Sequence, residues 1–459
     1  MVARGTTLKW ALTAAVIGLA TLTGATACAP SAPARADWQT ATSPTTEVSH
    51  GCRGQNSEVE QAVDPVGAYV YEEWIGCGNH IGFAASLDGG LHFGKPVILA
   101  DSAGSWDPSV AVAPSGAVYV AFMRASANHM FPVVEVSYDH GQTFPQVTQL
   151  VPAAPGNWGD RDFIAIAPAG TAYVTWDYGP SASEVKLLCS KVGSCSFSAG
   201  DFNIVLQRSS DSGRTWSPIA HVSPGFPASG GDSAPLLVTP GGQIYTEYQR
   251  YQITSLKKLT LGTAHSFVTS SGDDGSTWSA PVRIGPAEPA MNDSEWWIDG
   301  AISADAAGNL YVTWDTQSGG ADVGWLAYST DHGEHWSKPQ RVTPDTDQAT
   351  HIVEVAAGQP GVAYVGWLAD DTSSGYALYL RAFSIRTGWL TRRVTVSRAY
   401  GNPSIWPGDT FGLSTLPPLA RGPQAHWPRV VVSWGSAVGG ARALAQDRAA
   451  VVSFQPRST

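Results

Sequence analysis

The feature that most limits the possible folds of this chain is an eight-residue pattern, Ser-x-Asp-x-Gly-x-x-aromatic, which occurs five times. The copies begin at Ser86, Ser137, Ser209, Ser271 and Ser329, and a shortened sixth at Ser384 lacks the aspartate. In the copy SSDSGRTW, Gly213 permits a left-handed backbone, and Ser209 and Asp211 can bond the free amides of a turn. Trp216 can pack beside a neighbouring strand. These roles are structural, so the octet predicts equivalent turns in a repeated unit.

A second pattern, a short strand core, alternates with the octet. Its seven copies are GAYVYEEW (67–74), GAVYVAFM (116–123), GTAYVTWD (170–177), GGQIYTEY (241–248), GNLYVTWD (308–315), GVAYVGWL (361–368) and PRVVVSWG (428–435). Further short apolar runs before and after each copy indicate four strands per unit. The sequence therefore predicts an all-β fold, a β-propeller of seven four-stranded blades, with six blades and a capping sheet as the alternative. Because the last unit has no octet, we expect Ala449–Phe454 to form its outer strand.

Composition supports this fold and excludes one class of partner. The 459 residues include 18 Trp, 49 Gly and 31 Pro, which suits short strands joined by many tight turns. The formal net charge is −11, and the 27 Lys and Arg residues form no basic block. We therefore expect no binding of nucleic acid, which requires a concentrated positive charge.

The first 27 residues are typical of an export signal. Arg4 and Lys9 precede an apolar run from Trp10 to Leu22, which is shorter than the roughly 20 residues that span a bilayer. ATAC (25–28) resembles a lipoprotein cleavage box with Cys28 as the lipidated residue, and secretion after cleavage at Ala27 or Ala36 is the alternative. Residues 28–50, rich in Ala, Pro, Ser and Thr, predict a tether before a propeller of residues 51–459. We expect an extracellular monomer, either a cell-surface lipoprotein held to the membrane only by its lipid or a secreted protein.

The cysteine count agrees with export. Setting Cys28 aside leaves four cysteines for an oxidising compartment. Proximity in the sequence favours two disulfides, Cys52–Cys77 and Cys189–Cys195.

The octet is similar to the Asp-box, or bacterial neuraminidase repeat, and residues 51–459 resemble the Asp-box propellers, a superfamily that includes the sialidases. The resemblance implies that each octet joins the third and fourth strands of a blade, on the face opposite the ligand site. It is specific for the fold and much less so for activity, because function depends on the site. The loops that lead into each first strand, and those that join the second strand to the third, should therefore form the functional face, here called the top.

Acidic side chains dominate the top loops. Those that lead into the first strands carry Glu58, Asp107, Asp160, Asp162, Asp232, Glu295, Asp299 and Asp409. Trp106, Trp158 and Trp296 are candidate platforms on which a sugar could stack. Two interpretations stay open: the acids cap the backbone of the first strands, or they bind a carbohydrate together with the aromatic side chains.

The resemblance to sialidases is incomplete at the residues that do the chemistry. A sialidase needs an arginine cluster for the substrate carboxylate, a Tyr nucleophile activated by Glu, and an Asp acid/base. Its Phe/Tyr-Arg-Ile-Pro motif is absent, and CRGQNSEVEQAV (52–63) stands in that region. Arginines of the first four units could form a cluster instead: Arg53, Arg124, Arg161 and Arg250, with Tyr251 beside Arg250 and Glu247 as a partner.

The candidate site residues therefore rest on position and not on a motif. Candidate catalytic residues are Asp107, Arg161, Arg250, Tyr251 and Glu295, and candidate substrate-binding residues are Arg53, Trp106, Arg124, Trp158 and Trp296. No H-E-x-x-H, EF-hand, P-loop or dinucleotide signature is present, so we expect no cofactor, with Ca²⁺ at the rim carboxylates as the alternative.

Three functions are compatible with the sequence. The first is an exported propeller that binds glycan at its top face, with or without hydrolysing it. The second is an exo-α-sialidase or a related glycoside hydrolase. The third is a protein-interaction scaffold in the cell envelope that uses the same face.

Overall fold

The chain divides into residues 1–35 and 36–459, and the described residues all belong to the second unit. The computed structural model describes residues 38–65, 69–126, 129–152, 158–179, 187–189, 195–197, 203–223, 229–232, 235–255, 260–289, 300–318, 321–343, 350–371, 375–398, 408–419, 425–437 and 443–456. Among these residues every regular element is a strand, which confirms the predicted all-β class. None of them forms a helix with the length and apolar character needed to cross a bilayer.

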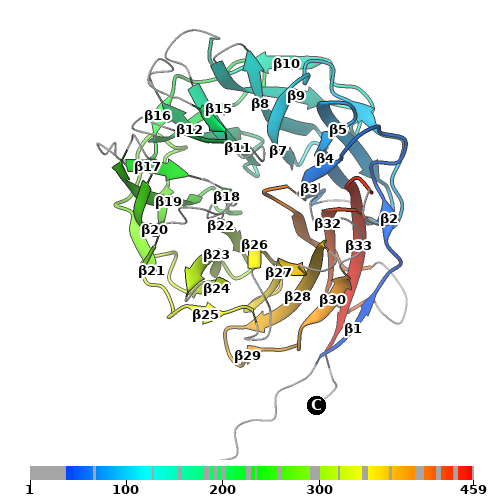
Figure 1. Cartoon of the computed structure of the whole chain (residues 1–459), viewed down its shortest axis with the longest axis vertical. Helices are drawn as coiled ribbons and strands as arrows, with labels where there is room; N and C mark the ends of the chain where they lie inside the picture. Colours follow the sequence, from blue (N-terminus) through cyan, green and yellow to red (C-terminus); the bar gives the residue numbers. More distant parts are fainter. Residues whose placement is uncertain are drawn as a thin grey trace, which may run out of the picture. The chain divides into compact units, whose positions relative to one another are not determined.

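Apart from one short hairpin, the described strands form seven antiparallel sheets, the predicted blades (Figure 1). Blade 1 comprises β3 (Ser57–Val63), β4 (Val70–Gly76), β5 (His80–Ser86) and β6 (Val97–Ile98). Blade 2 comprises β7 (Ser105–Val112), β8 (Val118–Ser126), β9 (His129–Ser137) and β10 (Gln146–Gln149). Blade 3 comprises β11 (Trp158–Ile166), β12 (Ala172–Gly179), β15 (Asn203–Ser209) and β16 (Ala220–His221), with the hairpin β13 (Leu187–Cys189) and β14 (Cys195–Phe197) between β12 and β15.

The remaining blades follow the same order from the inner strand outward. Blade 4 has an inner strand in two pieces, β17 (Ser229–Asp232) and β18 (Leu236–Val238), then β19 (Ile244–Ser255), β20 (Thr260–Ser271) and β21 (Val282–Pro289). Blade 5 comprises β22 (Gly300–Ala304), β23 (Leu310–Ser318), β24 (Ala321–Ser329) and β25 (Gln340–Arg341). Blade 6 comprises β26 (Thr350–Ala357), β27 (Val362–Asp371) and β28 (Gly375–Ser384), which pairs with both β29 (Gly388–Trp389) and β30 (Val394–Ser397).

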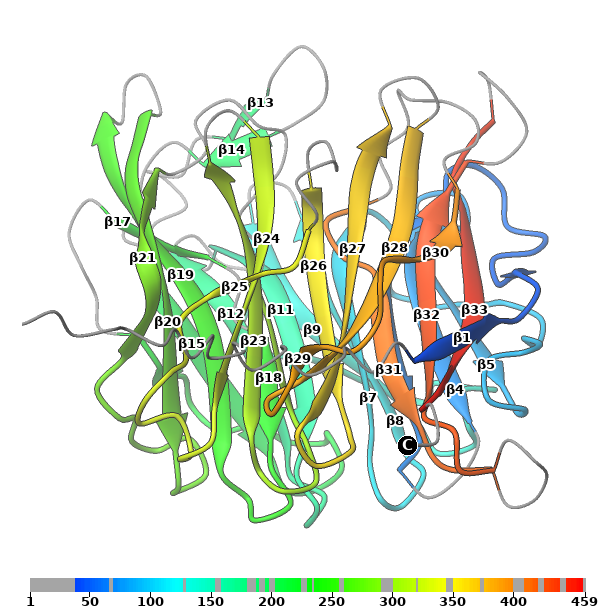
Figure 2. The ribbon, with the colours of Figure 1, turned by 90° about the horizontal axis from the view of Figure 1, so that it is seen from below.

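The strands of blade 7 differ from those predicted at both ends of the propeller. It comprises β31 (Gly412–Leu416), β32 (Arg429–Ser436) and β33 (Gln446–Gln455), and its outer edge is β1 (Gln39–Thr42) together with β2 (Thr46–Glu47). The segment Ala449–Phe454 is therefore part of the third strand, and not the predicted outer one. The folded part also begins before residue 51, because residues predicted as tether pair with the last long strand (Figure 2).

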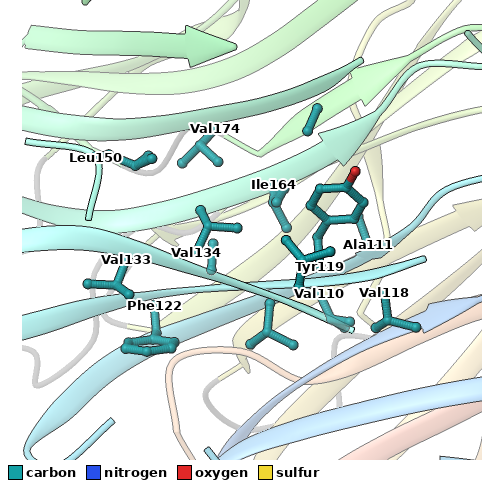
Figure 3. Close-up of a cluster of buried hydrophobic side chains, with 14 of the residues drawn as sticks. Val110, Ala111, Val118, Tyr119, Phe122, Val133, Val134, Leu150, Ile164 and Val174 are labelled. Carbon is teal, nitrogen blue, oxygen red and sulfur yellow. The ribbon is translucent and has the colours of Figure 1, made fainter. Parts of the chain in front are cut away.

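The blades form a closed ring. Inner strands of consecutive blades contact one another in the order β3, β7, β11, β18, β22, β26 and β31, and β31 contacts β3 again. Apolar side chains fill the spaces between blades, as Figure 3 shows for Tyr119 and Val134 of blade 2 beside Ile164 and Val174 of blade 3. Burial between neighbouring sheets explains why these strands are apolar on both faces.

The octets form the predicted turns, all on the bottom face. In blade 3, the N–H of Gly213 donates to Ser209 Oγ at 2.9 Å, and the N–H of Thr215 donates to Asp211 Oδ1 at 2.9 Å. Two successive residues, Ser212 and Gly213, have left-handed φ angles of 65° and 79°. A Cβ on Gly213 would lie 2.8 Å from Val136 of blade 2, so the octet also packs on the preceding blade. Its role is structural, as predicted from the sequence.

Candidate functional site

The inner strands of all seven blades line a central cavity of about 370 Å³. Its wall carries Glu60 of blade 1 and Glu354 of blade 6, with the hydroxyls of Ser109, Ser303 and Ser414. The strands run from the top face toward the octets, so residues at their first positions surround the upper mouth of this cavity.

Three polar residues occupy equivalent places at that mouth. Glu58 in β3, Asp107 in β7 and Arg161 in β11 each lie where the pairing register with the second strand shifts. Each has a left-handed backbone, with φ angles of 56°, 48° and 48°. Such a conformation costs about 1–3 kcal/mol in a residue other than glycine, and bulges of this kind re-aim side chains beside binding sites. The repeated bulge thus turns three charged or ionisable side chains to one mouth.

Hydrogen bonds join these residues to a fourth, Asp409, which precedes β31. The guanidinium of Arg161 donates from Nη2 to Asp409 Oδ2 at 2.8 Å, and its backbone N–H donates to Asp107 Oδ2 at 3.2 Å. Gly408 has a φ of 107°, and a Cβ there would collide with the backbone of Glu58. Glycine therefore lets the loop that carries Asp409 lie directly against Glu58. The mouth cluster is Glu58, Asp107, Arg161 and Asp409, from blades 1, 2, 3 and 7.

Burial favours the protonated form of Glu58. Its side chain is buried, and desolvation raises the pKa of Glu58 well above the usual range, with further increases from the charges of Asp107 and Asp409. The positive charge of Arg161 lowers the pKa of Glu58 but does not offset these increases. The Glu58 carboxyl is in hydrogen-bonding contact with Asp107, so it presents an O–H donor next to an acceptor. A neutral carboxylic acid in such a site can donate a hydrogen bond or a proton.

Two further buried acids lie behind the mouth cluster. Desolvation raises the pKa of Asp162 and of Glu73, and the charge of Asp107 adds to the effect on Asp162. Glu60 and Asp162 in turn raise the pKa of Glu73. The carboxyl oxygens of Glu73 and Asp162 are buried and have no hydrogen-bond partner among the described side chains. This interior therefore disfavours negative charge.

Trp106 is the one predicted sugar platform whose side chain the structure describes. It precedes Asp107 in β7 and is 53% exposed, which is unusual for a large aromatic side chain in this molecule. An exposed indole is suited to stacking on a sugar ring. The side chains of Trp158 and Tyr251 and the whole of Glu295 and Trp296 lie outside the described residues, although Trp158 begins β11 and Tyr251 lies in β19.

Two of the predicted arginines form ion pairs with different acidic residues. Arg124 forms an exposed ion pair with Asp101 at 2.9 Å, whereas Arg161 pairs with Asp409. Arg53 is exposed next to a disulfide, and its carbonyl accepts the Gly78 N–H. Burial lowers the pKa of Arg250, which lies in β19 near Tyr248. Arg161 is therefore the arginine that joins the mouth cluster.

Glu247 does not lie on the same face of β19 as Arg250. Side chains alternate along a strand, so positions three apart point to opposite faces. Glu247 is fully buried, and a Cβ on Gly300 of blade 5 would collide with its carboxylate. Glu247 and Tyr251 are four positions apart in β19, and the partnership predicted between them stays a prediction, because the side chain of Tyr251 lies outside the described residues.

One of the two predicted disulfides is confirmed. Cys52 and Cys77 are bonded, which joins the segment before β3 to the loop after β4 at the top of blade 1. Cys189 and Cys195 are directly opposite in the paired strands β13 and β14, but their side chains lie outside the described residues. Cys28 also lies outside them.

The predicted Ca²⁺ alternative remains a prediction. Among the described residues, the acidic and histidine side chains close enough to share an ion are Asp331, Glu334 and His335. They belong to the octet of blade 5 on the bottom face, where His335 Nδ1 lies 2.7 Å from Asp331 Oδ2. This group is part of the turn itself.

The sequence named Glu58 and Asp409 as rim acids but did not single them out. The signal that could have done so is local: Asp409 follows Gly408, and Glu58 stands at the same place in its first strand as Asp107 and Arg161 do in theirs.

Comparisons with known proteins identify the fold and no family. No protein-family model matches the chain, and no curated protein matches it. A protein of unknown function from Dyadobacter fermentans has 12% identity and a TM-score of 0.51, covering 91% of this chain and 99% of that one. A family 25 polysaccharide lyase, an ulvan lyase bound to a GlcA–Rha3S unit, has 12% identity and a TM-score of 0.52, covering 85% and 93%. The NanB sialidase from Streptococcus pneumoniae has 11% identity and a TM-score of 0.47, covering 85% and 83%.

Proposed function

We propose that this chain is an exported Asp-box propeller that binds a glycan at its top face, with the mouth cluster as the centre of the site. The observation that carries the proposal is the buried Glu58 carboxyl in contact with Asp107, whose partner Arg161 bridges to Asp409. Sugars are recognised by neutral donors and acceptors combined with an aromatic platform, and Trp106 is exposed beside Asp107. The likeness to the ulvan lyase, which is bound to a sugar chain, supports the same class of ligand.

Within this site Glu58 acts as a donor to a sugar hydroxyl or glycosidic oxygen. Asp107 accepts the Glu58 hydrogen bond in the free protein and becomes an acceptor for a sugar hydroxyl when ligand is present. Arg161 positions Asp107 and Asp409, since its backbone N–H donates to Asp107 and its guanidinium donates to Asp409.

The spacing of the two acids favours binding over two-carboxyl hydrolysis. The carboxyl groups of glycosidases stand about 5–5.5 Å apart in retaining enzymes and about 6.5–9.5 Å apart in inverting ones. Glu58 and Asp107 are in hydrogen-bonding contact, which leaves no room for a sugar between them. If the chain hydrolyses its ligand, Glu58 is the acid and the second carboxyl is another residue.

The exo-α-sialidase alternative has less support. A sialidase grips its substrate carboxylate with several convergent arginines. Here Arg161 is engaged by Asp409, and Arg124 is engaged by Asp101. Turnover of a fluorogenic sialoside would nevertheless restore this alternative.

Glycan-array binding followed by calorimetry tests the proposal. We expect binding that weakens at least tenfold in Trp106→Ala and is unchanged in Arg124→Gln, whose ion pair lies outside the mouth cluster. Binding should also fall as the pH rises through the Glu58 pKa, whereas Glu58→Gln, a permanently neutral donor, should bind independently of pH. Absence of binding to any glycan, or equal affinity in Trp106→Ala, would overturn the proposal.

Export and anchoring form a separate part of the proposal. Cys28 is the proposed lipid attachment site, followed by a short tether to the propeller. Fractionation of cells that express the chain should find it with membranes, and Cys28→Ser should release it to the medium. A Cys28→Ser protein that stays with the membrane fraction would contradict lipid anchoring.

A further inference from the structure

Exposed apolar side chains gather on one side of the bottom face. Leu87 and Leu91 of the blade 1 octet are 69% and 41% exposed, and Tyr138 of the blade 2 octet is also exposed. Leu419, in the loop that follows β31 of blade 7, is exposed as well. In the described part of the chain, the octets of blades 3, 4 and 5 expose no large apolar side chain. The bottom of blades 7, 1 and 2 therefore differs from the bottom of those blades.

The two leucines of blade 1 depart from the repeat at positions that face solvent. At the position of Leu91 the other four octets carry polar residues: Gln142, Arg214, Ser276 and Glu334. At the position of Leu87 they carry Tyr138, Ser210, Gly272 and Thr330. The turn does not require leucine there, because its serine accepts the same glycine N–H at 2.9 Å in blade 1 and in blade 3. Exposed leucines that the fold does not need indicate a surface that another body covers.

The blade 1 octet lies against an apolar region of blade 7. A Cβ on Gly89 would lie 4.0 Å from the side chain of Leu416, which begins the run Leu-Pro-Pro-Leu that ends at Leu419. Beside this run, a cavity of about 660 Å³ lies between blades 6, 7 and 1, and its walls include Pro65, Pro360, Pro417, Pro418 and Trp427. The apolar bottom surface consists of Leu87, Leu91, Leu419 and the walls of this cavity.

This surface carries little negative charge, although the whole chain has a formal charge of −11. Its chain segments on the outside are residues 86–95, 416–419 and 425–429. They contain one acidic residue, Asp88, and the basic residues Lys95 and Arg429. The cavity wall adds Asp64, which is buried. Apolar side chains with little exposed negative charge are suited to a lipid bilayer, whose surface is neutral or anionic.

The N-terminal segment enters the propeller at the same face, on blade 7. Gln39 of β1 pairs with Gln455, the last residue of β33, and third strands run toward the bottom (Figure 2). The Trp38 N–H donates to the carbonyl of Leu390, which directly follows the shortened octet of blade 6. Cys28 is ten positions before Trp38, and a chain of that length spans at most about 36 Å. A lipid on Cys28 would therefore hold the bottom face close to the membrane.

We propose that the apolar bottom surface lies on the lipid bilayer, with Leu87 and Leu91 in its interfacial layer and the mouth cluster facing away from it. This inference rests on the proposed anchoring at Cys28 and adds the face that meets the lipid. Burial of the leucines in lipid removes their apolar area from water. The lipid chain supplies one signal for membrane binding and the leucines supply a second, while the opposite face stays open to a glycan.

An environment-sensitive fluorophore, NBD, on a single introduced cysteine tests which face meets the lipid. Leu91→Cys places the probe on the apolar bottom surface, and Ser276→Cys places it at the equivalent exposed position of the blade 4 octet. Both variants are made in the full lipidated chain, in vesicles of phosphatidylcholine and phosphatidylglycerol that contain a nitroxide lipid. We expect the emission of the Leu91→Cys probe to move to shorter wavelength and to be quenched at least twofold more than that of Ser276→Cys.

Vesicle sedimentation of the Cys28→Ser chain measures the contribution of the leucines without the lipid anchor. We expect weak binding to the same vesicles, and a bound fraction at least fivefold lower when Leu87→Ser and Leu91→Ser are added. The midpoint of thermal unfolding should not change, because both side chains are exposed. Gln142→Ser, at the position equivalent to Leu91 in blade 2, is the matched control and should leave the bound fraction unchanged.

The outcomes separate this inference from the anchoring on which it rests. Equal quenching at the two probe positions in a chain that is anchored, or an unchanged bound fraction in the double leucine variant, would overturn this inference alone. A lipid-free Cys28 in a chain that never reaches the membrane fraction would overturn both. A shift of the Leu91→Cys emission that needs no lipid and grows with protein concentration would show that a second copy of the chain covers the surface instead.

Discussion

Arg161 of blade 3 and Asp409, at the start of blade 7, form an ion pair of 2.8 Å across the mouth of the central cavity. The two blades are not neighbours in the ring, because blades 1 and 2 stand between them on one side. The side chains are 7% and 20% exposed, so the pair is largely shielded from water. The ion pair therefore connects blades 3 and 7, which no strand pairing connects among the described residues.

Replacing Arg161 by Met should destabilise the protein by about 3 kcal/mol, the lower end of the range for breaking a buried ion pair. The loss leaves Asp409 without its cation and removes the one positive charge that lowers the pKa of Glu58. Urea unfolding followed by tryptophan fluorescence measures the change. Arg124→Met is the control, because its ion pair with Asp101 is solvent-exposed and should contribute less than about 1 kcal/mol. Equal losses in the two variants would contradict the shielding of the Arg161 pair.

Stability should fall as the pH rises from mildly acidic to alkaline values. Burial raises the pKa of several carboxyl groups in the folded state: Glu58, Glu72, Glu73, Asp162 and Asp447. The folded protein then binds protons more tightly than the unfolded chain, whose Glu pKa is about 4.3. Stability is complete below that value and decreases as the pH approaches the folded-state pKa.

Glu73→Gln isolates this effect, since both carboxyl oxygens of Glu73 are buried and, within the described part of the chain, have no hydrogen-bond partner. The variant should match the parent near pH 4 and be more stable at pH 8, as measured by the midpoint of thermal unfolding. Asp139→Asn is the opposite case, because hydrogen bonds from Thr143 lower the pKa of Asp139 to about 2. The contribution of Asp139 to stability should be complete above the pKa of Asp in the unfolded chain, and it should be lost as the pH falls toward 2. A Glu73→Gln gain that is the same at both pH values would refute the titration.

The octet glycines should be more sensitive to substitution than other left-handed glycines. Gly213→Ala combines a left-handed φ of 79° with a contact of 2.8 Å to Val136. Gly170→Ala has a φ of 91° but open space around its Cβ. The backbone strain should destabilise both variants by about 1–2 kcal/mol, and overpacking should destabilise Gly213→Ala by about 1–3 kcal/mol more. Denaturant unfolding of the two variants compares them directly, and equal destabilisation would show that the octet does not pack tightly on the preceding blade.

The repeats were sufficient to predict the fold because each blade uses the same local chemistry. Ser209, Asp211 and Gly213 form their turn from neighbouring residues, so the pattern is visible in the sequence. The outer strand of blade 7 was not predictable in this way. Gln39–Thr42 is exposed along its length and has no apolar pattern, and its partner is more than four hundred residues away.

The candidate site was predicted as a set of residues but not as an arrangement. Asp107 and Arg161 were named as candidates and Glu58 and Asp409 as rim acids, yet their meeting depends on bulges that shift the register of β3, β7 and β11. A bulge has no fixed sequence signature, and the pKa of Glu58 depends on burial by distant segments. Sequence reasoning therefore could not separate these acids from the others on the rim.

Closure of the ring by β1 gives the last prediction. β1 pairs with β33 from Gln39 to Thr42, the Ser43 N–H donates to the Val451 carbonyl, and the Trp38 N–H donates to the Leu390 carbonyl of blade 6. A chain that begins at residue 51 loses these bonds and exposes one edge of β33. With each bond contributing about 1 kcal/mol, the loss should exceed about 3 kcal/mol and favour association through the free edge.

A chain that begins at Ala36 is the matched control, because it keeps β1, β2 and Trp38. It should unfold at the same denaturant concentration as the full chain and elute as the same species in size-exclusion chromatography. The chain from residue 51 should unfold earlier and elute partly as larger species. If the two shortened chains behave alike, β1 does not close the ring, and the three strands β31, β32 and β33 are sufficient to complete blade 7.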